Sequence, residues 1–227
     1  VWVDAIARLD SFVSLAEFSE LFADQTCKPE LVALKPGADV FEAQGLGHPL
    51  IARGKRVSNS VRLGAGQRCI LITGSNMSGK STFLRTVGIN LLLAQAGAPV
   101  FARSFRFSLR EVRTSLRVRD SLLDEVSTFF AEVRRLKEVL DAASNGVLYL
   151  IDEIFQGTNN RERLLGSRAY IEALLKTSSV GLIATHDLER AELERAHAEL
   201  KNHHFRETIE GGQKDYKMSF SYELHPG

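Results

Sequence analysis

The stretch Gly74–Ser81 reads GSNMSGKS and fills every fixed position of the P-loop pattern G-x-x-x-x-G-K-[ST]. A polyphosphate is densely charged, so its site needs inward-pointing backbone N–H groups, glycines that allow a curved path, a cation and a hydroxyl that can reach a metal ion. The stretch provides each of these groups at the required spacing. It therefore predicts a binding loop for the phosphates of a nucleotide.

The residues on either side of this loop support the same interpretation. Residues 68–73 form a short apolar run typical of a buried strand, and residues 82–96 have helical periodicity. Chance matches to the pattern rarely lie between a strand and a helix. The context therefore favours a genuine nucleotide site.

The composition limits the remaining classes of protein. With 227 residues and 44% hydrophobic content, the chain can bury one sizeable core, or one core plus a small appendage. The 29 Lys and Arg against 28 Asp and Glu leave a net charge of +1, so the whole-chain charge gives no argument for nucleic-acid binding. Any DNA contact is expected to be local, or to lie outside this chain.

The sequence carries no membrane or export signal. No apolar stretch reaches the length of about 18 residues that a membrane span needs, and no signal peptide is present. Cys27 and Cys69 match no metal or redox spacing, which suits a reducing compartment. We expect a cytoplasmic location and two buried apolar thiols. Because the chain begins with Val1 and not with Met, segments of a longer protein would change this expectation.

The chain divides at about residue 37. Up to about residue 21, apolar residues recur at three- and four-residue spacing, as on one face of an amphipathic helix: Trp2, Ile6, Leu9, Phe12, Val13, Ala16 and Leu21. This helix either packs on the following domain or ends a longer helical region, and we prefer the second alternative. Residues 27–37 read as a linker. We therefore predict a helical segment with a linker at 1–37 and a nucleotide-binding domain at 38–227.

Strands alternate with helices in the second part, which predicts an α/β fold with a largely parallel sheet flanked by helices. The period-two pattern near the end follows a Gly-Gly turn and predicts an antiparallel hairpin. The predicted strands are 41–43, 57–63, 70–73, 101–109, 112–116, 147–151, 180–184 and 216–224, and the predicted helices are 82–96, 127–143 and 163–176.

Polar residues follow three of these strands. The loop at residues 74–81, the pair Asp152-Glu153 and the pair Thr185-His186 each stand directly after a strand. In a parallel sheet, ligands bind at the carboxyl ends of the strands. The three segments are therefore expected to meet at one edge.

Each polar group has a chemical role at such an edge. Lys80 is expected to reach the β- and γ-phosphates, while Ser81 and Asp152 are expected to hold Mg²⁺. Glu153 is the natural general base for an attacking water, although acidic pairs at strand ends also cap the next element. His186 is placed to sense the γ-phosphate, although a lone His is more often structural.

Several segments, taken in order, resemble one family. They are GLGHPL at 45–50, GSNMSGKSTFLR at 74–85, Ser127-Thr128-Phe129, YLIDEIFQGTN at 149–159 and Ala184-Thr185-His186. In this order they resemble the ATPase domain of MutS-type mismatch-repair proteins, over about residues 40–227. The pair Asn76-Met77 is the most discriminating, because generic P-loop ATPases rarely carry it. The first helix is similar to the end of the helical lever before that domain.

The resemblance implies a P-loop NTPase fold of the ABC-ATPase-like type, which binds ATP or ADP with Mg²⁺ and hydrolyses ATP slowly in isolation. It implies a homodimer with composite sites, in which Ser127 acts in trans and residues 157–159 (Gly157, Thr158, Asn159) cross the interface. DNA is implied as a partner of the parent protein. His204 is implied to stack on the adenine, although an ordinary strand residue fits that position equally well. The residues assigned to the nucleotide are Gly74, Ser75, Asn76, Met77, Ser78, Gly79, Lys80, Ser81, Thr82 and His204.

This chain departs from the family pattern at several positions. Arg56 stands where the family usually carries an adenine-stacking aromatic, and Ser75 and Ser78 stand where MutS itself tends to have Pro and Gly. These departures indicate a divergent branch. Two alternatives stay open at this point: a head domain of an SMC-like or transporter-like ATPase, and a nucleotide-binding interaction module without turnover. Asn76-Met77 argues against the first, and Glu153 against the second.

Overall fold

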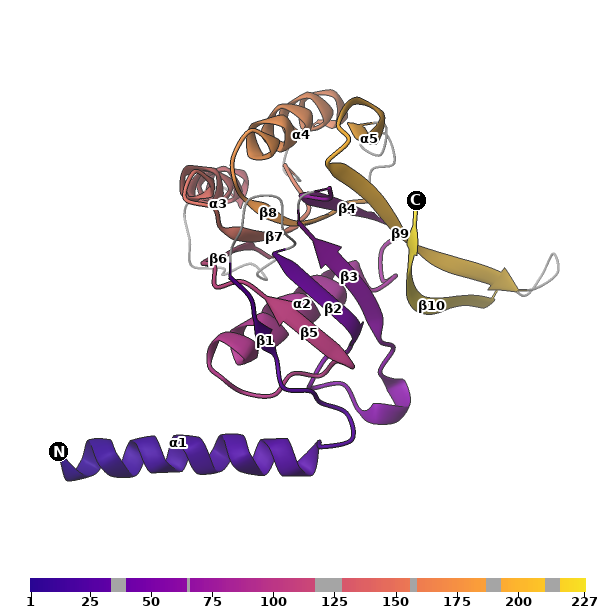
Figure 1. Cartoon of the computed structure of the whole chain (residues 1–227). Coiled ribbons are helices and arrows are strands. Elements are labelled where there is room, and N and C mark those ends of the chain that lie inside the picture. Colours follow the sequence, from indigo (N-terminus) through magenta and orange to yellow (C-terminus); the bar gives the residue numbers. More distant parts are fainter. Residues whose placement is uncertain (34–39, 65, 117–127, 156–158, 187–192, 211–216) are drawn as a thin grey trace.

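A six-stranded sheet forms the centre of the computed structural model, which describes residues 1–33, 40–64, 66–116, 128–155, 159–186, 193–210 and 217–227 (Figure 1). Its strand order is β10-β9-β4-β8-β7-β6, in which only β10 runs antiparallel to its neighbour. The strands are β4 (Cys69–Thr73), β6 (Val112–Ser115), β7 (Leu148–Asp152), β8 (Val180–Ala184), β9 (Leu200–Glu210) and β10 (Lys217–Pro226). The predicted parallel sheet and terminal antiparallel hairpin are thus confirmed.

A second, four-stranded sheet has the order β1-β5-β2-β3 and was not predicted. Its strands are β1 (Glu30–Leu31), β2 (Phe41–Leu46), β3 (Asn59–Leu63) and β5 (Ser104–Phe107), with β1 parallel to β5 and the other pairs antiparallel. Strand β1 lies inside the segment predicted as a linker. With two residues it is too short to give a period-two pattern.

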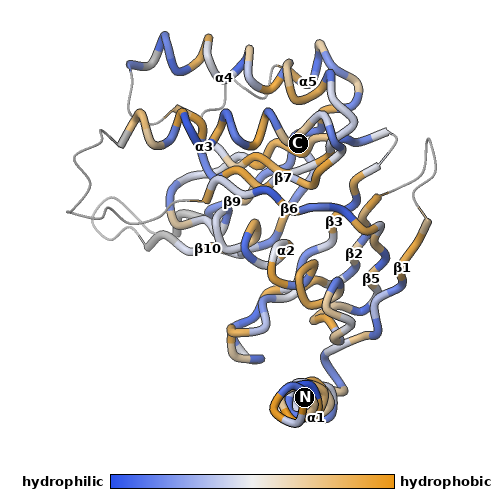
Figure 2. Tube along the Cα trace, turned by 90° about the vertical axis from the view of Figure 1, so that its left-hand side faces the viewer, coloured by the Kyte–Doolittle hydropathy of each residue, from blue (hydrophilic) through white to orange (hydrophobic). Residues whose placement is uncertain are grey.

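Helices cover both faces of the larger sheet. The helices of the described ranges are α1 (Trp2–Leu21), α2 (Lys80–Gln95), α3 (Thr128–Ala143), α4 (Asn160–Leu175) and α5 (Leu193–Ala196), with a short 3₁₀ turn at Arg53–Lys55; α1 covers neither face. Helices α3 and α4 lie on one face, and α2 lies on the other face, between the two sheets (Figures 1 and 2). The mixed α/β fold flanked by helices is therefore confirmed.

The central strand β4 shows why its sequence is a continuous apolar run. Ile70 and Ile72 pack into the core around α2, while Cys69 and Leu71 pack into the core beneath α3 and α4. All four side chains are fully buried, so both faces of the strand need apolar residues. This packing fixes the carboxyl end of β4, and the loop at 74–81 starts directly after it.

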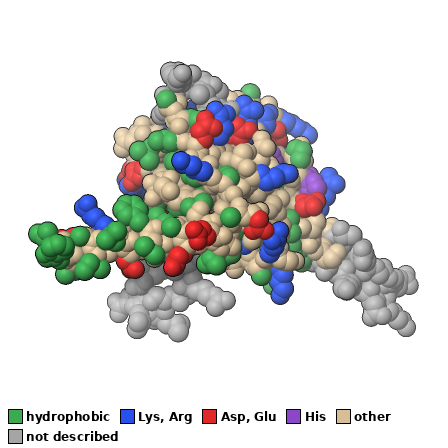
Figure 3. Space-filling view, turned by 60° about the horizontal axis from the view of Figure 1, so that its bottom comes forward, with side chains coloured by type: hydrophobic (Ala, Val, Ile, Leu, Met, Phe, Trp, Pro, Cys, Tyr) green, Lys and Arg blue, Asp and Glu red, His purple; other side chains and the backbone are tan. Residues whose placement is uncertain are grey.

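Helix α1 projects from the domain, with no buried residue along its 20-residue length (Figures 1 and 3). Contact with the domain occurs where it ends: the rings of Phe18 and Phe22 lie 5.6 and 5.1 Å from the ring of Phe101. No helix of the described ranges has the length and apolar content to cross a membrane. Both cysteines are free; Cys69 is buried as expected, whereas Cys27 is only half-buried.

Candidate nucleotide-binding site

The loop Gly74–Ser81 follows β4 and leads into α2 along a path that needs glycine. Gly74 and Gly79 have φ angles of 147° and 106°, where L side chains are strained. A β carbon at Gly74 would also lie 2.9 Å from the Ser78 hydroxyl and 3.1 Å from the carbonyl oxygen of Phe205. The two fixed glycines of the pattern are therefore required by the backbone path. This path brings the chain to the N-terminus of α2, whose unpaired N–H groups favour an anion.

Lys80 is buried against the loop that precedes it. Its ammonium donates hydrogen bonds to the carbonyl oxygens of Gly74 (2.7 Å) and Ser75 (2.8 Å). Burial lowers the pKa of Lys80, while the nearby carboxylates of Glu153, Asp152 and Glu207 act to raise it. The cation is thus held between the loop and the carboxylates at the strand ends.

Two acidic residues stand at the carboxyl end of β7, beside β8. Asp152 pairs with Ala184 in the ladder, and the next backbone N–H, of Glu153, donates to the carbonyl oxygen of Ala184 (3.0 Å). Glu153 has a φ of 68°, a conformation that costs a non-glycine residue about 1 kcal/mol or more. With 7% and 9% exposure, both carboxylates are nearly buried at this edge.

The structure also brings Glu153 and His186 together. A carboxylate oxygen of Glu153 lies 2.9 Å from Nδ1 of His186, which follows β8. The histidine ring remains partly exposed at 42%, whereas the Glu153 side chain has 10% exposure. The imidazole can therefore orient the carboxylate while keeping its other nitrogen accessible.

A cavity of about 760 Å³ opens over these groups, which suits a ligand of nucleotide size. Ser81, Asp152 and Glu153 line it together with Lys80, whereas Gly74 and Ser75, the carbonyl partners of that lysine, are not part of the lining. The complete lining is Leu46, His48, Ile51, Lys55, Val57, Asn59, Asn76, Met77, Ser78, Gly79, Lys80, Ser81, Thr82, Phe83, Thr86, Asp152, Glu153, Phe205 and Tyr222.

The residues at this cavity fit Mg²⁺ held mainly by phosphates. Ser81 and Asp152, the two predicted ligands, line the same cavity. Mg²⁺ commonly takes one or two protein oxygens and completes its shell with water and substrate phosphates. Within the described ranges no three His, Cys, Asp or Glu side chains gather as a preformed metal cage. The donor set therefore suits a metal ion that arrives with a nucleotide.

Three of the predicted interface residues, Ser127, Gly157 and Thr158, fall outside the described residues. The fourth, Asn159, is described and caps α4. Its side-chain oxygen accepts a hydrogen bond from the backbone N–H of Glu162 (3.0 Å). This contact starts the helix in the ordinary way.

His204 lies outside the cavity lining. Its Nε2 accepts a hydrogen bond from Arg206 (2.8 Å), and its ring centroid is 5.8 Å from that of His225. Burial, Arg206 and His225 all lower its pKa. These side-chain contacts are with its own hairpin, while the residue lies opposite Thr73 of β4 in the parallel ladder.

Tyr222 of β10 does line the cavity, as does Phe205 of β9. Tyr222 stands beside the loop, where a β carbon on Gly79 would lie 3.0 Å from its ring. The period-two pattern gave no sign of this role, because it placed Tyr222 on a regular strand face with Phe220 and Leu224. In the structure, the pairing of β10 with β9 shifts register between those two residues.

Arg56 also differs from its expected place. Its guanidinium lies 4.3 Å over the ring of Phe101 and donates to the carbonyl oxygen of Ile51 (3.0 Å) and to Gln25 (2.9 Å). It lines a second cavity of about 360 Å³ and not the one at the loop. The neighbouring Val57 lines the main cavity instead.

Comparison with known proteins agrees with this arrangement. The family model for MutS domain V matches residues 70–227, which include the loop, both strand-end acids and the terminal hairpin. The matched part covers more than half of the chain. This match defines the class of protein: the chain belongs to the MutS family.

Curated relatives align over most of this chain. It is 31% identical over 247 residues to the DNA mismatch repair protein MutS 2 of Haloarcula marismortui, covering 99% of this chain and 25% of that protein. It is 32% identical over 194 residues to the DNA mismatch repair protein MSH6 of Arabidopsis thaliana, covering 81% and 15%. It is 36% identical over 185 residues to MutS 1 of Halobacterium salinarum, covering 80% and 21%. The chain therefore spans a quarter or less of the length of these relatives.

Proposed function

We propose that this chain is the ATP-binding and ATP-hydrolysing domain of a MutS-related mismatch-repair protein. The observation that carries the proposal is a single cavity lined by both Lys80 and Glu153. The lysine belongs to the loop at residues 74–81, and the glutamate carboxylate pairs with His186. Mg-ATP-driven dimerisation of this domain would control DNA binding by regions outside this chain. The chain resembles a divergent branch of the family, because Ser75 and Ser78 depart from the common loop.

The loop and the start of α2 supply the phosphate side of the site. Backbone N–H groups at the N-terminus of α2 favour the negative phosphates. The Lys80 ammonium, now bonded to two carbonyl oxygens of its own loop, adds a cation at the same place. Ser81 and Asp152 would hold Mg²⁺, which neutralises phosphate charge when it is bound. Tyr222 and Val57, which also line the cavity, provide apolar surface for the base.

Glu153 supplies the base for hydrolysis. Its carboxylate accepts the proton of a water that attacks the γ-phosphate, and His186 holds the carboxylate in place through the 2.9 Å contact. Its low exposure keeps bulk water away from the reacting group. The proposed partner subunit adds Ser127 in trans, and residues 157–159 would cross the interface.

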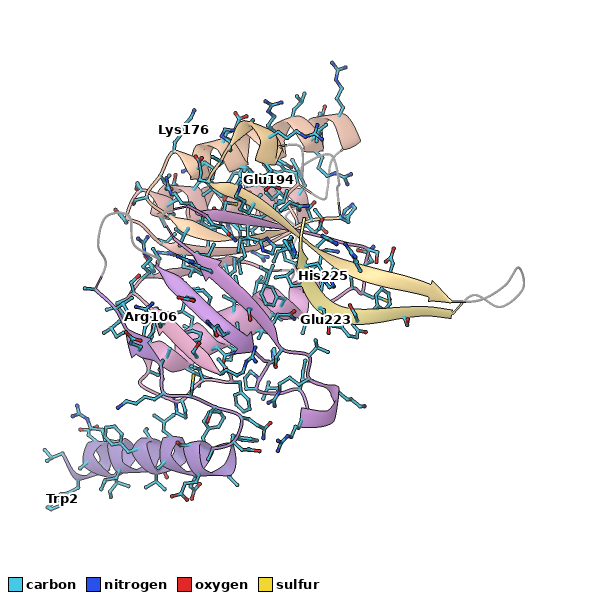
Figure 4. The ribbon with its side chains drawn as sticks, turned by 45° about the vertical axis from the view of Figure 1, so that its right-hand side comes forward. Trp2, Arg106, Lys176, Glu194, Glu223 and His225 are labelled. Atoms are coloured by element: carbon cyan, nitrogen blue, oxygen red, sulfur yellow. The ribbon has the colours of Figure 1, made fainter. Side chains whose placement is uncertain are left out.

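The proposal is tested by measuring Mg-ATP binding and steady-state ATP turnover for the chain and for Lys80→Ala. Removing a charged hydrogen-bonding group costs about 1.5–3 kcal/mol, so we expect the affinity for ATP to fall roughly 10- to 150-fold. Lys176→Ala is the matched control, because Lys176 is exposed at the end of α4 and far from the cavity (Figure 4). Circular dichroism would check that both variants fold.

Two outcomes would contradict the proposal. Unchanged ATP affinity in Lys80→Ala would remove the loop from phosphate binding. If the unmodified chain binds ATP but shows no turnover as an isolated domain or in its full-length parent, the chain is a nucleotide-binding interaction module instead.

We also expect His186→Ala to lower kcat by about tenfold or more, with a smaller change in KM. The variant loses the hydrogen bond that orients Glu153, a contact that matters for the attacking water more than for binding. His197→Ala is a matched control, since Nε2 of His197 lies 3.8 Å from a carboxylate oxygen of Glu172, away from the cavity. Equal kcat values in the two variants would leave His186 without a role in turnover.

A further inference from the structure

One side chain joins the two sheets beside the cavity. Asn59, on β3 of the four-stranded sheet, donates from Nδ2 to the carbonyl oxygen of Tyr222 (3.0 Å). Its Oδ1 accepts a hydrogen bond from the backbone N–H of Leu224 (2.7 Å). Both partners belong to β10, the edge strand of the six-stranded sheet. The Asn59 side chain is therefore hydrogen-bonded to the backbone of β10 on both sides of Glu223.

The segment that Asn59 holds through these hydrogen bonds, residues 222–224, includes an irregular part of β10. The pairing with β9 shifts register between Phe220 and Leu224, so the residues between them leave the regular ladder. Tyr222 has a φ of 56°, which is uncommon and strained for an aromatic residue. Glu223, labelled in Figure 4, stands at the bend of the strand.

An asparagine suits this position because one amide group both donates and accepts. A bulge leaves backbone groups without partners in the ladder, and an unpaired polar group is costly where water is excluded. The two hydrogen bonds with Asn59 satisfy the carbonyl of Tyr222, inside the irregular segment, and the N–H of Leu224, where the ladder resumes. They also favour the positive φ of Tyr222 over a regular extended conformation.

The bulge determines where the Tyr222 ring lies. The ring stands beside Gly79 of the phosphate-binding loop, and both Tyr222 and Asn59 line the main cavity. With 43% of its surface exposed, the tyrosine leaves part of its ring open to a ligand. A flat base can stack on such a ring whatever its substituents, because every base has a π-face.

We propose that Asn59 is a positioning residue that holds Tyr222 over the phosphate-binding loop, so that the base of a nucleotide stacks on the tyrosine ring. The inference rests on the proposed function, and it assigns the base side of that same site. Asn59 acts through the backbone of β10. The phosphates would be bound without its help.

This division between base and phosphates gives a direct test. We expect Asn59→Ala to weaken ATP binding about tenfold, the size of one lost stacking interaction, and to leave the binding of inorganic tripolyphosphate unchanged. Asn145→Ala is the control, because Asn145 is an exposed residue before β7, at the opposite end of that strand from Asp152.

A double-mutant cycle separates positioning from general destabilisation. In a Tyr222→Ala background, Asn59→Ala should cause no further loss of ATP affinity, because the ring that it positions is gone. Hydrogen exchange of the Leu224 amide should be faster in Asn59→Ala than in the unmodified chain. This exchange rate reports the hydrogen bond between Asn59 and the Leu224 amide in the absence of any ligand.

The outcomes distinguish this inference from the proposed function. If the unmodified chain binds neither ATP nor tripolyphosphate, both proposals fall. If it binds both, but Asn59→Ala weakens them equally or not at all, the assignment of Asn59 alone is overturned. Additive losses in the cycle, or an unchanged exchange rate at Leu224, would overturn it as well.

Discussion

Glu153→Gln is expected to lower the steady-state rate of ATP hydrolysis by about 10²- to 10⁴-fold, the usual contribution of a general base. The substitution preserves the size of the side chain and removes its ability to take a proton. The amide can still accept a hydrogen bond from His186, so the pairing across the strand ends is retained. Lys80 and the loop are untouched, so ATP should still bind and drive dimerisation.

The measurement combines ATP turnover, equilibrium ATP binding and the mass of the complex with ATP present. Glu138→Gln serves as a control, because Glu138 is an exposed residue on α3 in a loose pair with Arg134 at 3.9 Å. Such surface pairs contribute little. Turnover equal to that of the control would remove Glu153 from its role. Loss of ATP binding together with turnover would instead place the carboxylate in nucleotide affinity.

Several strands and helices predicted from apolar periodicity contribute buried residues to the core, whereas the periodic helix α1 contributes none. The run at 180–184 coincides with β8 because all five of its residues are buried. The four-stranded sheet was harder to predict, because its strands pair across long sequence separations. Phe41 of β2, for instance, lies opposite both Leu63 and Phe107. Such pairing depends on tertiary packing, which local patterns do not encode.

The structure brings Lys80 and Glu153 to one cavity, as the sequence predicts, whereas the place of Tyr222 at that cavity was not predicted. Glu153 stands directly after β7, and Lys80 belongs to the loop that follows β4, so chain order alone brings both to one edge. Tyr222 reaches the cavity through a register shift that its own neighbours do not signal. The same shift is stabilised by Asn59, which is 163 residues away along the chain. The sequence therefore predicts the positions that parallel strands determine, and it does not predict a position that depends on a contact between the two sheets.

Gly181→Ala is expected to destabilise the whole domain. Gly181 sits inside β8, where it pairs with Cys69 on one side and Tyr149 on the other. A β carbon there would lie closer than 3.0 Å to the carbonyl oxygen of Tyr149 and to two carbons of its ring. Tyr149 is 1% exposed and is packed in the core beneath α3 and α4. Neither the ring nor the carbonyl has space to withdraw.

The loss of stability should be large because the added β carbon would clash with a backbone atom, the carbonyl oxygen of Tyr149. Overpacking a core costs about 1–3 kcal/mol when side chains can adjust, and more when they cannot. We therefore expect the free energy of unfolding to fall by about 3 kcal/mol or more, a large part of the roughly 5–15 kcal/mol that holds a typical domain together. For a chain of this size the corresponding fall in Tm is roughly 10 °C.

Chemical and thermal unfolding of Gly181→Ala and Gly54→Ala would check this expectation. At Gly54, an added β carbon meets nothing within 4 Å, so the same change of residue should leave stability nearly unaltered. The difference between the two variants isolates the clash from the general effect of replacing glycine, which acts largely on the unfolded chain. Since β8 lies between β4 and β7, the strands that carry the phosphate-binding loop and Glu153, the clash should also separate the two halves of the site. Equal stability of the Gly181→Ala and Gly54→Ala variants would refute the close contact between Gly181 of β8 and Tyr149 of β7. Any folded Gly181→Ala protein is expected to lose more turnover than ATP affinity.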